Sequence, residues 1–234
     1  MTDQLHFADS GEAADLAAFL GRLVHYDRAA AVRLQARAGG DALAVFGRPP
    51  SFEVLAVRAV RLAAPRATPL DVTVSAGELL ESVDETGAGA RVPGAVTGPP
   101  WTGVLPPQGG WRPVPGLPAP EAVRAALAEA WARDEALPPQ HRTRSERDRI
   151  GREIWSRTLG DTELPLRAAH AAQSLGFLRP VRVTAPAGGA AGAPAPVALF
   201  ASGGWLRLST PYGSVATRQP GPGGGLGALQ VRPL

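Results

Sequence analysis

The segment 52–63 restricts the fold most, because apolar residues occupy both faces that a strand there would present. Its sequence, FEVLAVRAVRLA, stays apolar on both faces for most of its length. A strand of this kind is buried on both sides, so it fits the middle of a sheet better than an edge. We therefore expect a sheet in which residues 52–63 form a central strand.

The residues on either side of this segment predict further strands and a short helix. Residues 32–38 alternate between apolar and polar side chains, which is the pattern of a half-buried strand. A Gly-Gly-Asp turn leads from it into the apolar residues 42–46, so a hairpin is expected. A strand over 71–74 then leads into Ser75 and Glu78, whose spacing is that of a capping box before a short helix.

Apolar residues at helical spacing predict one long helix near the N-terminus and three in the C-terminal half. The first is expected to begin at Ser10, a suitable N-cap residue, and to end near residue 27. The other three are expected at about 120–137, 145–158 and 165–175. Short strands are expected near 178–184, 196–201, 205–209 and 214–217.

Together these elements predict an α+β fold, with a mainly antiparallel sheet and about five helices in a single compact unit. We expect one domain over residues 1–218 and a flexible tail over 219–234. The domain would consist of an N-terminal α/β part (1–86), a long loop rich in glycine and proline (87–119), and C-terminal helices and strands (120–218). A chain of 234 residues buries enough surface to fold without a disulfide or a metal.

The basic residues are all arginine, and this excludes several kinds of chemistry. The chain has 24 arginines and no lysine, asparagine or cysteine, beside 28 glycines and 24 prolines, which points to a very GC-rich genome. Without lysine there is neither a P-loop nor a Schiff base with pyridoxal phosphate, and without cysteine there is no thiolate catalysis. The four histidines form no HExxH-like motif. We therefore expect no cofactor and no metal.

Charge and hydropathy predict a cytoplasmic protein that does not enter a membrane. The first residues include Asp3, Asp9 and Glu12, where an export signal would carry positive charge and then an apolar run. The longest charge-free stretch, 183–206, is interrupted by prolines and glycines, so it does not fit a membrane span. The net charge of +3 is a weak signal for nucleic acid, and we favour a monomer among the oligomeric states.

Two groups of residues are candidates for binding another cytoplasmic protein. The first is the loop that carries Trp101, Trp111 and Arg112, since tryptophan and arginine are typical anchors at binding surfaces. The second is the arginine-rich helix expected at 145–158, because arginine forks bind anionic groups well. Its candidates are Arg144, Arg147, Arg149 and Arg152.

Each group also has a plainer interpretation. The two indoles could plug the core beneath the long loop, because tryptophan is usually well buried. The helix arginines could lie on a solvated face that carries ion pairs, such as Asp148 with Arg152 at a spacing of four residues.

Three classes of function stay open, and we favour a non-enzymatic binding or regulatory protein that acts through protein contacts. The second class is a winged-helix-like nucleic-acid binder, because three helices followed by strands is the element order of that fold. Its third helix would present Arg167, His170, Gln173 and Ser174 to DNA. The third class is an enzyme that uses His25 with Asp27 or Glu53 in a pocket. No G-x-S-x-G elbow supplies a nucleophile for such a pair, so we predict no catalytic residue.

Three phrases of the sequence resemble an actinobacteria-restricted family of conserved proteins. They are HYDRAAAVRLQARAG (25–39), FEVLAVRAVRL (52–62) and GGWLRLSTPYGSVA (203–216). The family has no assigned biochemical role, and a related member in sporulating mycelial bacteria is associated with binding a ParA-type partition ATPase and influencing its assembly. The resemblance therefore implies a protein-binding role.

Overall fold

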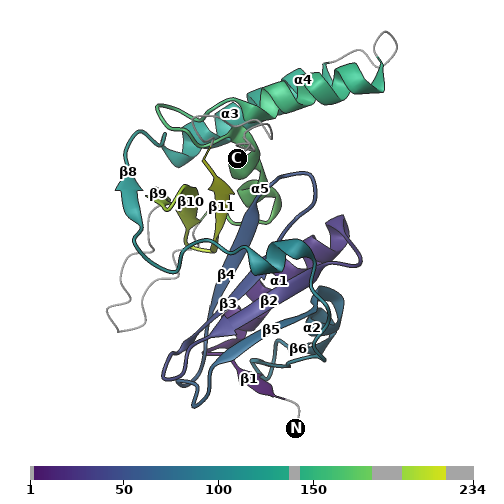
Figure 1. The fold of residues 1–234 in the computed structure, drawn as a ribbon, viewed down its shortest axis with the longest axis vertical. Coiled ribbons are helices and arrows are strands. Elements are labelled where there is room, and N and C mark those ends of the chain that lie inside the picture. Colours follow the sequence, from purple (N-terminus) through teal and green to yellow (C-terminus); the bar gives the residue numbers. More distant parts are fainter. Residues whose placement is uncertain (1–2, 137–142, 181–196, 220–234) are drawn as a thin grey trace, which may run out of the picture.

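An eight-stranded antiparallel sheet is the frame of the protein (Figure 1). The computed structural model describes residues 3–136, 143–180 and 197–219. The strands of this sheet are β2 (Ala31–Ala36), β3 (Ala42–Gly47), β4 (Leu55–Arg61), β5 (Leu70–Ser75), β8 (Arg112–Val114), β9 (Ala198–Ser202), β10 (Trp205–Thr210) and β11 (Gly213–Arg218). Their order is β5-β2-β3-β4-β11-β10-β9-β8. A smaller antiparallel sheet contains β1 (Gln4–His6), β7 (Gly89–Arg91) and β6 (Val83–Asp84).

The described residues form five α-helices, so the α+β fold and its mainly antiparallel sheet are confirmed. The helices are α1 (Ser10–Tyr26), α2 (Ala76–Ser82), α3 (Pro120–Glu135), α4 (Arg144–Ser156) and α5 (Leu166–Ser174), with a 3-10 helix η1 (Pro100–Gly103). α1 packs on β4 and on α2, while α5 packs on β10 and β11. α3 and α4 pack on each other and on α5, so they form the layer farthest from the sheet.

The apolar segment that suggested a central strand does lie in the middle of the large sheet. β4 pairs with β3 on one side and with β11 on the other. Its first four residues are all buried, because both of its faces are covered. The predicted hairpin is also present: β2 alternates between buried and partly exposed residues, and Gly39 takes a φ of 73° in the turn before β3.

The pairing of β4 with β11 joins strands from opposite ends of the chain. It extends over three residue pairs, from Val57 opposite Ser214 to Leu55 opposite Ala216. Arg58, beside this pairing, points to the α1 side of the sheet, and its side chain is 7% exposed. Its guanidinium donates to Glu12 of α1 at 2.7 Å and to the carbonyl oxygen of Tyr212 at 3.0 Å. One buried cation therefore connects β4, α1 and the turn between β10 and β11.

Three local predictions are corrected by the structure. The N-cap of α1 is Asp9 rather than Ser10, because the Asp9 carboxylate accepts the Glu12 backbone N–H at 2.9 Å. The expected loop over 87–119 contains β7, η1 and β8, and β8 forms by pairing with the distant β9, which a local pattern cannot reveal. The strand expected at 178–184 is absent over 178–180, and its remaining residues and the tail from 220 onward lie outside the described residues.

Replacing Arg58 is expected to destabilise the fold strongly. In Arg58→Met, the carboxylates of Glu12 and Asp15 would lose their shared buried cation, which should lower the free energy of unfolding by about 3 kcal/mol. Urea denaturation would measure the loss. Arg61→Met is the control, since the Arg61 side chain is 63% exposed and its ion pairs should contribute at most about 1 kcal/mol. Equal losses in the two variants would contradict the role given to Arg58.

Candidate binding site on the outer sheet face

The outer face of the large sheet is the face that points away from α1. Because Arg58 contacts α1, its neighbour Ala59 on β4 points to the outer face. By strand register, Ala44 of β3, Ala216 of β11 and Arg207 of β10 share that face. Alanine fills little space, so the middle of the face is hollow between its larger neighbours.

The segment 97–111 crosses the outer face (Figure 1). Its residues Pro106, Pro107, Gln108 and Trp111 line the hollow from one side. Its tryptophans, Trp101 and Trp111, pack on a small buried cluster made of Leu55, Trp205 and Ala216. Hydrogen bonds hold the segment in place along its length. Arg33 of β2 donates to the carbonyl oxygen of Thr102. The Ser202 hydroxyl donates to the carbonyl oxygen of Gly109 at 3.0 Å.

Between this segment and the sheet lies a cavity of about 530 Å³, which we call the sheet-face cavity. It combines small or aromatic apolar side chains with a few charged ones. The apolar lining includes Ala44, Phe46, Ala59, Trp111 and Ala216, and the charged lining consists of Arg37, Asp41, Asp71 and Arg207. Its volume lies within the range of about 300–1,000 Å³ that is usual for small-molecule sites.

Arg207 brings an uncompensated positive charge to the sheet-face cavity. Its Nε donates to the Ser214 hydroxyl at 2.9 Å, and its guanidinium carbon lies 5.7 Å from the ring centre of Trp111. Among the described residues, no acidic side chain lies within 4.0 Å of it. Burial lowers the pKa of Arg207 from its ordinary value, although a guanidinium stays protonated in proteins. The cavity therefore offers a charged donor that none of the described side chains neutralises.

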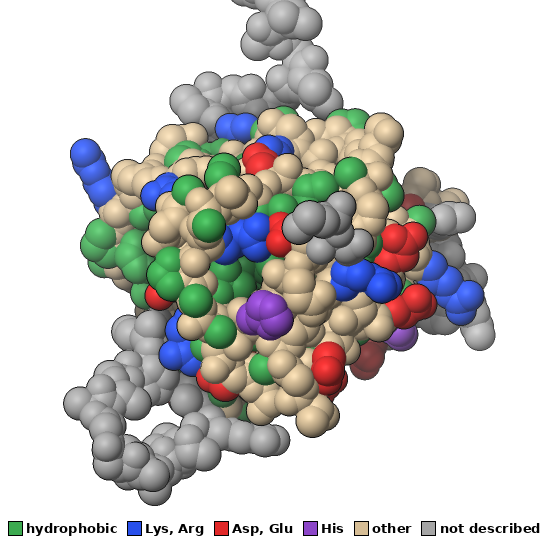
Figure 2. All heavy atoms as spheres, turned by 90° about the horizontal axis from the view of Figure 1, so that it is seen from below, with side chains coloured by type: hydrophobic (Ala, Val, Ile, Leu, Met, Phe, Trp, Pro, Cys, Tyr) green, Lys and Arg blue, Asp and Glu red, His purple; other side chains and the backbone are tan. Residues whose placement is uncertain are grey.

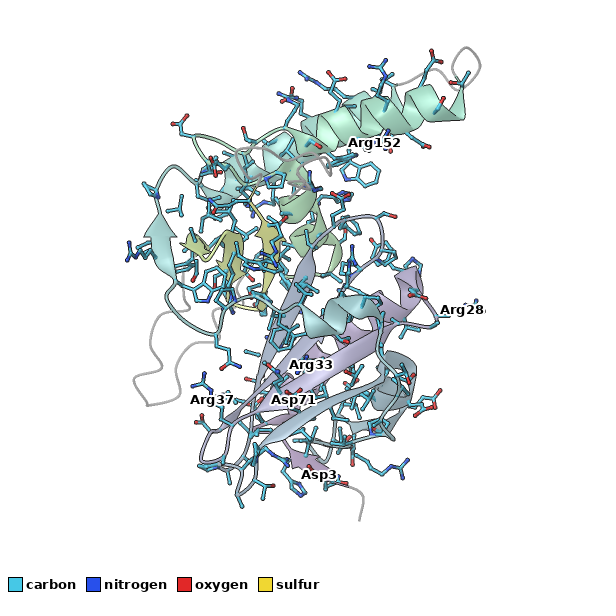
Figure 3. All side chains as sticks on the ribbon, in the orientation of Figure 1. Asp3, Arg28, Arg33, Arg37, Asp71 and Arg152 are labelled. Carbon is cyan, nitrogen blue, oxygen red and sulfur yellow. The ribbon has the colours of Figure 1, made fainter. Side chains whose placement is uncertain are left out.

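The acidic side chain of Asp71, by contrast, is already neutralised. Arg33 on the neighbouring strand donates two hydrogen bonds to the Asp71 carboxylate, at 2.7 and 2.8 Å. Figure 3 shows the two side chains next to each other. Gln35 adds a third at 3.1 Å. The hydrogen bond from Arg33 holds the pKa of Asp71 below its usual range, so the carboxylate stays ionised and paired.

The predicted loop residues have different positions. Trp101 and Trp111 are both half-buried, so they pack on the sheet as the plainer interpretation proposed, while each also borders a cavity. Trp111 lines the sheet-face cavity, and Trp101 lines a second cavity of about 500 Å³ whose charged residues are Asp27 and Arg48. Arg112 is exposed on the edge strand β8. A role of these residues in binding a partner stays a prediction.

The arginines of α4 lie apart from both cavities. Arg149 and Arg152 are exposed, and among the described side chains no ion pair joins Arg152 to Asp148 (Figure 3). The side chains of Arg144 and Arg147 lie outside the described part of the structure. Figure 2 shows the molecule from the end opposite α4, and on that face arginines and acidic residues are interspersed rather than gathered by sign. The structure therefore leaves Arg149 and Arg152 available to solvent or to a partner.

A cluster of aromatic rings joins the three C-terminal helices. Trp155 of α4 stacks on His170 of α5 with ring centres 4.3 Å apart, and Trp131 of α3 meets both edge-on. Trp131 is 41% exposed, so part of this cluster faces solvent. Burial lowers the pKa of His170, and the nearby charge of Asp134 opposes that shift. Packing in this cluster therefore favours the neutral form of His170, whose side chain is half-buried.

The residues proposed for the two other functions are not gathered into a cleft. His25 and Glu53 are exposed and line neither cavity, while Asp27 borders the second cavity and accepts the Ala29 backbone N–H at 2.9 Å. On the helix proposed to enter DNA, Arg167 forms an ion pair with Glu53 at 3.4 Å, and His170 lies in the ring cluster. Asp27, Arg167 and His170 therefore all contact other parts of the protein. An enzymatic role and a nucleic-acid-binding role both stay predictions.

Sequence reasoning missed Arg207, which it treated only as part of a strand and turn. The available signal was an arginine between two leucines in a strand pattern, where a polar residue would ordinarily face water. Only the folded structure shows that the segment 97–111 covers that face.

The fold and the cavity define an α+β protein with a ligand-sized hollow on one face of an antiparallel sheet. Residues 1–103 match the family described as Domain of unknown function (DUF8010), and residues 106–222 match Domain of unknown function (DUF8185). The second match covers half of the chain, which therefore belongs to the DUF8185 family. No curated protein matches the chain. Within the described ranges no helix could cross a membrane, and no three His, Cys, Asp or Glu side chains gather to hold a metal ion.

The packing of the half-buried His170 predicts a loss of stability in mild acid. Because its folded-state pKa is lowered, the unfolded chain binds the proton first as the pH falls below about 6.5, and the free energy of unfolding then decreases. Thermal denaturation between about pH 7.5 and pH 5.5 should show this decrease, and His170→Phe should reduce it. His25→Gln replaces an exposed histidine and should keep the wild-type response. An unchanged pH response in His170→Phe would refute the assignment.

Proposed function

We propose that this chain is a cytoplasmic, non-enzymatic binding protein, and that the sheet-face cavity is its ligand site. The observation that carries the proposal is a cavity of about 530 Å³ with an apolar lining and few charged groups. Ligand sites commonly combine these properties, because apolar walls supply affinity and a few polar groups fix the orientation of the ligand.

Hydrogen bonds to the sheet fix the wall of the cavity, which favours binding. Arg33 on β2 and Ser202 on β9, in opposite halves of the sheet, donate hydrogen bonds to the segment 97–111. Arg37 adds a hydrogen bond to the Gln108 side chain at 2.7 Å. A preformed site loses less conformational entropy when a ligand binds, so more of the contact energy contributes to affinity.

A second candidate function is the binding of another protein at the surface of α3 and α4. The observation that favours it is the partly exposed Trp131, which contacts Trp155 one helical turn after the exposed Arg152. Tryptophan and arginine together are frequent anchors of protein interfaces. The resemblance to a family linked with a ParA-type ATPase also supports a protein partner.

The ligand site can be tested with a neutral aromatic probe, 1-naphthamide. In methyl NMR spectra it should shift the alanine signals of the cavity floor, Ala44, Ala59 and Ala216, and leave the buried Ala168 of α5 unchanged. Ala44→Phe should remove these shifts because the larger side chain fills the hollow. Ala198→Phe is the matched control, since Ala198 lies on β9 outside the cavity lining. If no floor signal moves with 1-naphthamide or with the matching acid, 1-naphthoate, at any soluble concentration, the cavity is not a ligand site.

The protein-partner surface can be tested by affinity capture from an extract of the native host. Proteins retained by the wild-type chain at low salt should be lost with the double variant Arg149→Glu and Arg152→Glu, because two positive charges become negative. Arg91→Glu is the control, since Arg91 is an exposed arginine of β7, in the small sheet and outside the proposed surface. Equal retention by both variants would rule out the α4 surface.

A further inference from the structure

We propose that the sheet-face cavity selects organic acids, with the carboxylate of the ligand on Arg207 and a flat apolar body against Trp111 and Phe46. This inference rests on the proposed function, because it assigns a chemical class to the ligand of the same site. Three features carry it: the free donors of Arg207, the charges around the cavity, and the shape of the lining.

The guanidinium of Arg207 has donors left over. Its Nε is used by Ser214 at 2.9 Å, while neither Nη atom has a hydrogen-bond partner among the described residues. These Nη atoms are not among the buried atoms that lack a partner, so they reach the open space of the cavity. Two N–H groups on one side of a guanidinium match the two oxygens of a carboxylate.

The other charged groups of the cavity are committed or lie at its rim. Asp71 is held by Arg33, and Arg37 is exposed and bonded to Gln108. Asp41 is exposed as well. Arg207 is therefore the one half-buried charge of the lining without a counter-ion among the described residues, and an anionic ligand would supply it. An ion pair in such a partly dry site is stronger than the same pair in water.

The lining also limits the size and the charge of the ligand. Arg207 is the one half-buried cation of the described lining without a counter-ion, and it neutralises a single negative charge, so a monocarboxylate fits better than a phosphate dianion. The floor of alanines and the rings of Phe46 and Trp111 leave a space that suits a flat apolar body.

The test compares 1-naphthoate with 1-naphthamide, which have nearly the same shape and differ in charge. With the wild-type chain, calorimetry should show at least about tenfold tighter binding of the naphthoate, since a charged hydrogen bond contributes about 1.5–3 kcal/mol. Arg207→Met should remove this preference. Arg218→Met is the matched control, because Arg218 lies 4.4 Å over the Trp205 ring outside the cavity lining and its loss should leave the preference unchanged.

The outcomes separate this inference from the proposed function. Equal affinity of the wild-type chain for the two probes would overturn the selection of acids while the cavity remains a ligand site. If neither probe binds, both the ligand site and its selection of acids are overturned. Should Arg207→Met fail to fold, the comparison of the two probes on the wild-type chain still decides whether the cavity selects acids. The NMR signals of the Arg207 guanidinium then serve as the second measurement, because they should move with 1-naphthoate and stay fixed with 1-naphthamide.

Discussion

The buried guanidinium of Arg58 is the interaction on which the arrangement of the protein depends. It lies on β4 and bonds at once to Glu12 of α1 and to the backbone of Tyr212, which is 154 residues away in the sequence. The Arg58 side chain is 7% exposed, and a charge so buried is tolerated only where partners surround it. The ion pair with α1 and the hydrogen bond to the turn before β11 therefore fix both elements next to β4. The pairing of β4 with β11 beside Arg58 extends over only three residue pairs. Because so short a pairing supplies few contacts of its own, the bonds of Arg58 contribute a large share of the stability of this junction.

This junction also creates the candidate site. The chain matches one family over 1–103 and another over 106–222, and the sheet-face cavity takes its lining from both regions. Ala44 and Phe46 come from the first region, and Trp111 and Arg207 come from the second. A ligand in the cavity would touch both parts, and any ligand that binds only the folded protein stabilises it. Binding at the cavity and the joining of the two regions are therefore energetically linked.

The sequence predicts most of the elements and little of the site. Segments with a strong local period were found, such as the alternating residues of β2 and the doubly apolar β4, because burial on one or two faces leaves its mark on the sequence. β8 has three residues and is a strand only because it pairs with the distant β9, so no local sequence pattern predicts it. The cavity was hidden for the same reason. Ala44 and Ala216 are unremarkable in a chain rich in alanine until strand register places them on one face beneath a loop.

The all-arginine composition gives the charge in this cavity a property that lysine would not provide. A buried lysine can lose its proton and become neutral, whereas a guanidinium keeps its charge when it is partly desolvated. Burial lowers the pKa of Arg207, yet the group remains a cation at every physiological pH. The pH dependence of binding an organic acid would then come from the ligand alone, which is ionised above about pH 4–5. An arginine at this position thus fixes the electrostatic character of the site across the physiological pH range.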